Sequence, residues 1–215
     1  MLKIVAAVGT LLATLSVAFA AEALPAKLTY AIIMDGKPIG SETYDISRDG
    51  DRTDVQLTTD THGRVMFVNF HYHHQRSESW IGGKLQHLVA DTDDDGSKHH
   101  VEAVQTADGA LTVTADGKPL AVPANVFPLT MWNRAITAQT ALFAVENADS
   151  PYRVKIKDVG AETLTVGGQK LATEHYAMSG DVERDFWYDS EGLLAKVAFR
   201  RQGFGIAIVR TAVGG

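Results

Sequence analysis

Residues 64–80, RVMFVNFHYHHQRSESW, contain neither Gly nor Pro and are rich in Val, Phe and Tyr. This composition predicts one long β-strand, in which successive side chains point to opposite faces. Both faces are apolar near the start of the stretch and become polar further on. A strand that is buried on both faces at one end and exposed to solvent at the other favours a strongly curved sheet or an open barrel. One of its two faces carries Tyr72, His74, Arg76, Glu78 and Trp80.

Turn signals built on Gly recur about every ten residues along the chain, with alternating patterns between them, as in all-β meanders and barrels. The predicted strands are 27–34, 39–48, 54–61, 64–80, 84–92, 98–106, two short strands around Asp108-Gly109 and Asp116-Gly117, and then 152–159, 162–166, 169–178, 182–188, 193–201 and 204–213. We therefore expect a mainly all-β fold, a strongly curved antiparallel meander that forms a half-barrel or barrel.

Residues 131–147, MWNRAITAQTALFAVEN, break this alternation, because their apolar side chains fall at helical spacing. Thr130 precedes them and is suited to be the N-cap, since its hydroxyl can accept a hydrogen bond from a free backbone N–H. The pattern predicts one short helix that covers the open side of the sheet, with Trp132 and Ile136 facing the strands.

Residues 1–20 predict a secretory signal peptide, with an apolar run from Ile4 to Phe19 and a small-x-small site that ends at Ala20. The run is shorter than the roughly 20 residues that a membrane-spanning helix needs. A second small-x-small site ends at Ala23, which leaves the cleavage position open by about three residues. We expect a cleaved leader and a single β-rich domain over 21–215, with no transmembrane segment after cleavage.

The chain contains no Cys, so it has neither a disulfide nor a Cys that could carry a lipid anchor. A periplasmic or secreted location follows from the leader. The formal net charge is −6, and no basic stripe is present, which argues against nucleic acid as a partner. Motifs of known catalytic types are absent, so we expect a protein without enzymatic activity and without a cofactor.

Several landmarks of the chain resemble a family of exported bacterial proteins that is catalogued only as a domain of unknown function. They are Asp35 to Gly40 (DGKPIG), Tyr72 to Glu78, Trp80, Gly82-Gly83, Asp91 to Gly96, Trp132-Asn133, Trp187 to Asp189 and Gly192-Leu193. The resemblance covers essentially all of the chain after the leader. Its motifs define turns and strands and carry no catalytic chemistry, so the resemblance implies a fold and no activity.

The chain departs from this family in two places. Where the family has the sequence aromatic-Trp-Asn-Pro, this chain has Met131-Trp132-Asn133-Arg134. Where the family has Glu-Arg-Trp, this chain has Glu78-Ser79-Trp80. More distantly, a meander with one helix is similar to the half-barrels of periplasmic lipoprotein carriers, which bind acyl chains. That likeness concerns the fold, and a fold does not by itself define a function.

Two patterns point to metal ions instead. The stretch 91–102, DTDDDGSKHHVE, fits the calcium-loop pattern D-x-D-x-D-G-x5-E, although its flanks alternate as strands and so favour an acidic hairpin turn. His71 and His73 share a strand face and could ligate zinc or copper if a neighbour supplied a third ligand. The metal-handling alternative thus depends on His71, His73, Asp91, Asp93 and Asp95.

The leading hypothesis is a binding or carrier-like domain that holds an apolar ligand, such as a lipid or an acyl chain, on the concave face of the sheet. Aromatic and polar residues at the wet end of the long strand and near the helix are the expected lining. These are Tyr72, His74, Arg76, Trp80, Trp132 and Trp187. A third hypothesis, from another class, is an enzyme that acts through His74 and Glu78.

Overall fold

The computed structural model describes residues 26–65, 68–149 and 151–214, so the predicted leader lies outside the described residues. The described residues form one fifteen-stranded sheet and a short 3-10 helix, η1 (Arg134–Ala138). The first strands are β1 (Lys27–Met34), β2 (Lys37–Asp49), β3 (Arg52–Val65), β4 (Val68–Ile81), β5 (Lys84–Asp94), β6 (Ser97–Gln105), β7 (Leu111–Ala115) and β8 (Lys118–Leu120). The remaining strands are β9 (Phe127–Pro128), β10 (Ala141–Phe143), β11 (Tyr152–Val166), β12 (Gln169–Gly180), β13 (Arg184–Asp189), β14 (Leu194–Arg201) and β15 (Phe204–Gly214).

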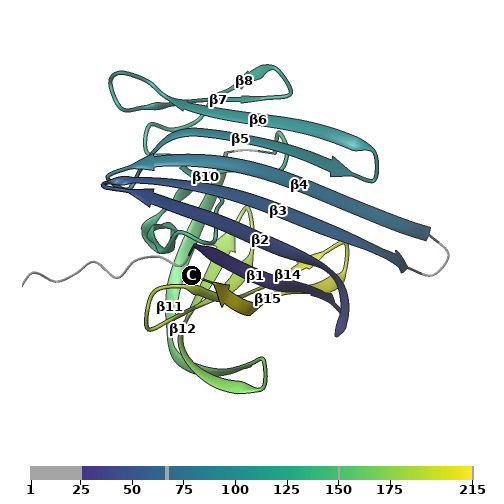
Figure 1. Ribbon diagram of the computed structural model, residues 1–215. Helices are drawn as coiled ribbons and strands as arrows, with labels where there is room; N and C mark the ends of the chain where they lie inside the picture. Colours follow the sequence, from purple (N-terminus) through teal and green to yellow (C-terminus); the bar gives the residue numbers. More distant parts are fainter. Residues whose placement is uncertain (1–25, 66–67, 150, 215) are drawn as a thin grey trace, which may run out of the picture.

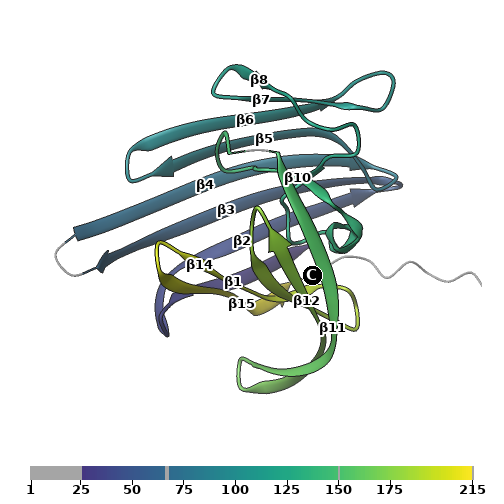
Figure 2. The same cartoon turned by 180° about the vertical axis from the view of Figure 1, so that it is seen from behind.

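Two meanders meet along β1 and β15. Strands β8 to β1 lie in sequence order on one side of this junction, and β15 to β9 continue the sheet on the other side. Neighbouring strands are antiparallel, except that β9 and β10 are parallel. Figure 1 shows the first meander as a broad layer of long strands. Figure 2 gives the view from behind, in which β11 runs across this layer in the foreground.

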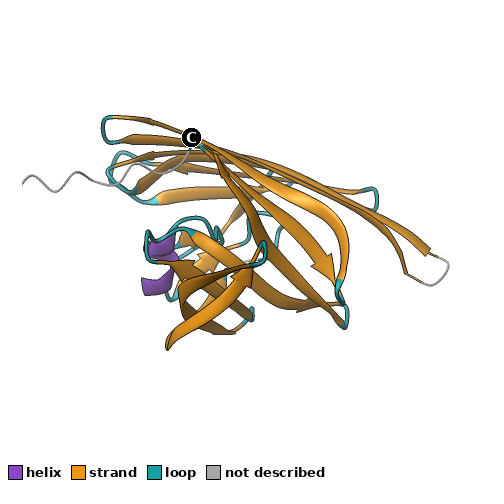
Figure 3. Cartoon of the chain, turned by 60° about the horizontal axis from the view of Figure 1, so that its bottom comes forward, coloured by secondary structure: helices purple, strands orange, loops and turns teal. Residues whose placement is uncertain are grey.

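The sheet is strongly curved. In Figure 3 the second meander curls beneath the broad first layer, and η1 lies at one side of the second meander. The prediction of a mainly all-β, curved antiparallel fold with barrel-like shape is therefore confirmed. Within the part of the chain that the structure describes, no helix is long and apolar enough to cross a membrane.

Alternation along the strands determines which side chains reach the interior. On β4, His74, Arg76, Glu78 and Trp80 are buried, whereas Gln75 between them is exposed. The core draws apolar side chains from both meanders and from the segment around η1. Its largest fully buried members are Tyr30, Tyr188, Phe143 and Phe186. Two of these also tie distant segments together, because Tyr30 donates to the Leu194 carbonyl and Tyr188 to the Met131 carbonyl.

The predicted long strand was wrong at its start. Arg64 belongs to β3, which ends at Val65, and β4 begins at Val68, while residues 66–67 lie outside the described residues. Gly63, which stands between the predicted strands 54–61 and 64–80, lies inside β3 opposite Phe70. A Cβ atom at Gly63 would lie 2.5 Å from Cζ of Phe70. This glycine therefore makes room for an aromatic ring on the next strand and does not reverse the chain.

The predicted helix is shorter than expected and begins later. Its N-cap is Asn133, whose side chain accepts the N–H of Ala135, while the hydroxyl of Thr130 accepts a hydrogen bond from Arg76 instead. Ile136 is fully buried, as predicted. The helix ends before β10, because the apolar residues of this segment pair with β9 and β11. Tertiary pairing thus overrides a weak helical preference.

A third difference concerns Gly160, which was expected to separate two strands. The structure has one strand, β11, that continues through it with a register shift between Asp158 and Gly160. Gly160 has a φ of 115°. A glycine with positive φ inside a strand is typical of a β-bulge, which bends the strand and increases its local twist.

We expect Gly40→Ala to lower the free energy of unfolding by about 1–3 kcal/mol, the usual range for overpacking. The added Cβ would lie 2.0 Å from the Asp60 carbonyl oxygen and 2.7 Å from Cα of Thr61, both backbone atoms of β3. Gly214→Ala is the matched control, since its nearest neighbour is 3.4 Å away. Urea unfolding curves check this, and equal midpoints for the two variants would contradict it.

Candidate functional site

The two meanders enclose a cavity of about 1170 Å³. Its walls come from β1 to β4 on one side and from β12 to β15 on the other, with a contribution from the loop after β10. Many of the lining side chains are apolar and come from both halves of the chain. They include Ile32, Met34, Ile39, Leu57, Phe70, Leu129, Met131, Met178, Val182, Val197, Phe199, Phe204, Ile206 and Ile208.

The carboxyl of Glu42 is a buried polar group on the β2 wall. It accepts hydrogen bonds from the hydroxyl of Tyr44 at 2.8 Å and from that of Thr59 at 3.0 Å. Burial raises the pKa of Glu42, and these two bonds offset the effect only in part. Glu42 faces inward because it lies on the same face of β2 as Tyr44 and Ile46, which are both buried.

Arg76 lines the cavity from β4 and is held from behind by a buried network. Its Nε lies 2.7 Å from Oε1 of Glu78, as an ion pair whose alignment is too poor for a hydrogen bond. Oε2 of Glu78 accepts the indole N–H groups of both Trp80 and Trp132, each at 2.8 Å. Burial opposes the charge of Arg76, but the surrounding carboxylates, Glu78 first, keep its pKa raised.

His74 lines the cavity one step further along β4. Its Nδ1 lies 2.8 Å from the hydroxyl of Thr92, and its Nε2 has no hydrogen-bond partner among the described residues. Burial, reinforced by the charge of Arg76, lowers the pKa of His74 to about 4. The imidazole is therefore neutral at neutral pH.

Glu146 lies in the loop after β10 and lines the cavity. Its side chain is 38% exposed although protein surrounds it, so the exposed surface faces the cavity. Burial alone would raise the pKa of this carboxyl, but the positive charges around it, Arg184 first, lower it instead. Oε1 of Glu146 lies 4.0 Å from Nη2 of Arg184, a loose ion pair.

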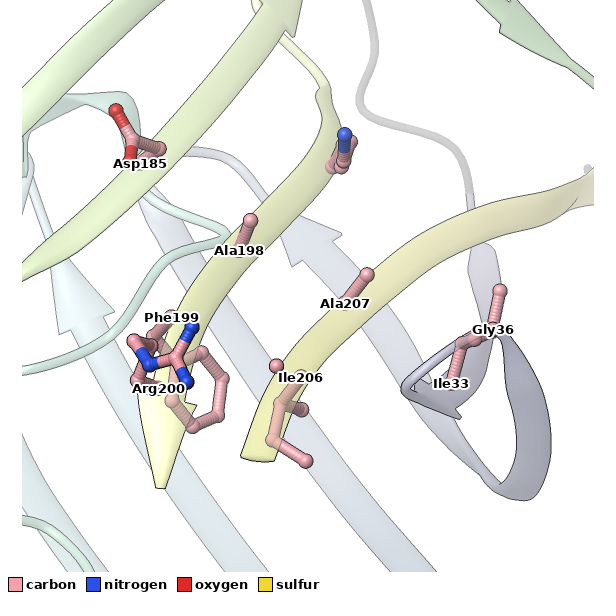
Figure 4. A pocket seen from close by; sticks show the side chains of 10 residues that line it. Ile33, Gly36, Asp185, Ala198, Phe199, Arg200, Ile206 and Ala207 are labelled. Carbon is pink, nitrogen blue, oxygen red and sulfur yellow. The ribbon is translucent and has the colours of Figure 1, made fainter. Parts of the chain in front are cut away.

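At the border of the cavity, an ion pair between Arg201 and Asp94 joins β14 to β5. The Arg201 guanidinium also lies over the ring of Tyr72, 5.2 Å from its centroid. Exposed residues such as Asp95 and Gln202 mark this border as an opening to solvent. A much smaller hollow of about 340 Å³ lies on β1, β14 and β15, and Figure 4 shows Ala198, Ala207 and Ile33 along it.

Only part of the predicted lining reaches the cavity. Tyr72, His74 and Arg76 do, from consecutive inward positions on β4. Trp80 and Trp132 lie behind the cavity wall, where they pack edge to face with ring centroids 5.9 Å apart. Trp187 points to the opposite face of the sheet, where it stacks on His175 and donates to Glu162.

Of the five residues of the metal hypothesis, Asp95 lies at the border of the cavity and the other four lie outside it, and each of the five makes local contacts. Nδ1 of His73 lies 2.5 Å from Asp60, and Asp95 accepts the backbone N–H of His71. Asp93 accepts the N–H of Gly96 in the hairpin turn, and Asp91 lies 2.8 Å from His100. Over the described ranges, no three His, Cys, Asp or Glu side chains are grouped so that they could hold a metal ion.

The enzyme hypothesis pairs His74 with Glu78, but the structure separates their environments. His74 lines the cavity, whereas both oxygens of Glu78 face Arg76 and the two indoles behind the wall. Sequence reasoning missed Glu42, Glu146 and Arg184. Glu42 carried a signal, since it is a charged residue at an inward position of an alternating strand. Glu146 carried none, because it lies in an irregular loop.

These features define a barrel-like β-protein with a large internal cavity that carries polar and ionisable groups. Residues 30–211 match the family described as "Domain of unknown function (DUF6134)", and the chain belongs to that family. No curated protein matches the sequence.

Among solved structures, the chain is similar to a β-barrel-like protein of the domain of unknown function DUF1849 from Brucella abortus. The TM-score is 0.63 at 12% sequence identity, and the match covers 89% of this chain and 98% of the other. At that identity the likeness concerns the fold alone.

Proposed function

We propose that this protein is a non-enzymatic binding or carrier-like domain that holds an apolar molecule, such as a lipid or an acyl chain, in the cavity between the two meanders. The cavity of about 1170 Å³ carries the proposal. Ligand pockets typically measure about 300–1,000 Å³ and combine apolar walls with a few placed polar groups. This cavity is slightly above that range and has both features.

The apolar part of its wall suits an apolar ligand. Met34, Phe199 and Ile206 supply apolar wall from three different strands, β1, β14 and β15. Removing an acyl chain from water is favourable by about 0.8 kcal/mol for each buried CH₂ group. We also propose that the chain is exported, because residues 1–20 carry the pattern of a signal peptide.

Titration with the uncharged fluorescent probe N-phenyl-1-naphthylamine tests the binding proposal. We expect saturable binding that Thr61→Trp weakens about tenfold or more, a difference of about 1.4 kcal/mol. Thr61 is an inward residue of β3 that lines the cavity, so an indole there occupies ligand space.

Thr58→Trp is the matched control, because Thr58 lies on the same strand with its side chain exposed. This variant is expected to bind the probe as the unmodified protein does. Equal weakening by both variants, or no saturable binding by the unmodified protein, would overturn the proposal.

A further inference from the structure

Two charged side chains of the cavity wall are incompletely satisfied. Arg184 and Glu146 approach only to 4.0 Å, beyond hydrogen-bond distance. Nε of Arg184 has no partner within the described residues, and its guanidinium carbon lies 4.6 Å from the ring centroid of Phe199. No hydrogen bond within the described chain reaches the Glu146 carboxylate. One donor and one acceptor thus face the same space without binding each other.

A third unsatisfied group lies nearby on β4. His74 is 2% exposed, lines the cavity and leaves Nε2 without a partner in the described part of the chain. A buried polar atom without a partner is destabilising by about 1–3 kcal/mol, so such atoms usually have a bonding role. His74, Arg184 and Glu146 all line the same cavity.

The charge around the cavity argues against an anionic head group. Seven carboxyl groups line it, against four arginines. Two of these arginines are already matched, Arg76 by Glu78 and Arg201 by Asp94. A carboxylate that entered beside Glu146 would meet a like charge at low dielectric, where repulsion is strong. A neutral group with both donors and acceptors would meet no such penalty.

We propose that Glu146, Arg184 and His74 form a subsite for an uncharged, hydroxyl-bearing head group, such as the glycerol of a monoacylglycerol or the sugar of an alkyl glycoside. Hydroxyls of the ligand donate to the Glu146 carboxylate and accept from Arg184 Nε–H, and a further hydroxyl bonds to His74 Nε2. This subsite rests on the proposed function, since the apolar chain of the same ligand occupies the cavity.

Displacement of bound N-phenyl-1-naphthylamine at neutral pH tests the head-group preference. The competitors share one decyl chain length and are kept below their micelle concentrations: monodecanoylglycerol, decyl glucoside and sodium decanoate. We expect at least one neutral competitor to displace the probe at about tenfold lower concentration than decanoate, which corresponds to about 1.4 kcal/mol. Comparison of monodecanoylglycerol with decyl glucoside then shows whether the subsite prefers a glycerol or a sugar head group.

Glu146→Gln keeps the shape of the side chain and removes its charge. We expect this variant to bind decanoate more tightly and to lose most of the preference for the neutral competitors. Glu183→Gln is the matched control, because Glu183 is an exposed residue at the border of the same cavity. This control is expected to keep the preference.

The outcomes separate the subsite from the binding function. If the probe binds and decanoate displaces it as well as the neutral competitors or better, the subsite is overturned while the cavity remains a binding site. The same holds if Glu146→Gln and Glu183→Gln change the preference equally. If neither probe nor any competitor binds, both proposals are overturned.

Discussion

Glu78→Gln is expected to lower the free energy of unfolding by about 3–5 kcal/mol, the range for removing one partner of a buried ion pair. Glu78 is 3% exposed, and its two oxygens face Arg76 and two indole N–H groups. The substitution keeps the volume of the side chain, so the loss reports charge and hydrogen bonding. It removes the ion-pair partner of the buried Arg76 guanidinium. Urea unfolding monitored by tryptophan fluorescence measures the change.

A double variant shows whether the uncompensated charge causes this loss. Arg76→Met together with Glu78→Gln removes both charges and leaves one amide oxygen for the indoles. We expect the pair to be more stable than Glu78→Gln alone, because neutralising both partners avoids a buried lone charge. Glu102→Gln is the control, since Glu102 pairs with His87 at an exposed site, where effects stay within about 0.5 kcal/mol. A double variant less stable than the single one would contradict this explanation.

Acidification is expected to lower stability through His74 by about 3 kcal/mol between neutral pH and about pH 4. Burial lowers the pKa of His74 from 6.5 to about 4. Between these two values the unfolded chain binds a proton that the folded chain does not. Stability therefore rises with pH across this window and is lost as the pH falls through it.

The measurement is urea unfolding of the unmodified protein and of His74→Gln at several pH values between about 4 and 7. Because Gln does not titrate, the free-energy difference between the two proteins should shrink as the pH falls. His73→Gln is the control, since His73 lies on the outer face of the same strand and pairs with Asp60. A constant difference between the unmodified protein and His74→Gln over this range would show that His74 is not the cause.

Local patterns in the sequence predicted most of the strands and the face each side chain takes. The alternation from Tyr72 to Trp80 placed His74, Arg76 and Glu78 on one face, and all three are buried. Glycine was harder to interpret. Gly63 makes room for the ring of Phe70 on the next strand, and Gly160 allows a bulge within β11. The sequence had placed both glycines between strands. The contact that requires a glycine can come from a neighbouring strand, and the spacing of residues along the sequence does not reveal that contact.

The candidate site was less accessible to sequence reasoning, because non-local contacts assemble it. The pairing of β1 with β15 joins residues near opposite ends of the chain and encloses the cavity. The long strand places Tyr72, His74 and Arg76 along the cavity. The loop that brings Glu146 to Arg184 has no periodic pattern. Trp187 was expected in the lining because it is aromatic. Its neighbours Phe186 and Tyr188 instead point into the main core.

Native mass spectrometry of the protein isolated from the cells that produce it, without detergent, tests the central claim most directly. A folded chain with one co-purifying lipid-sized adduct, lost in Thr61→Trp and kept in Thr58→Trp, is the result that a ligand-holding cavity predicts. Folded protein at the mass of the polypeptide alone, or with only a metal adduct, would contradict it.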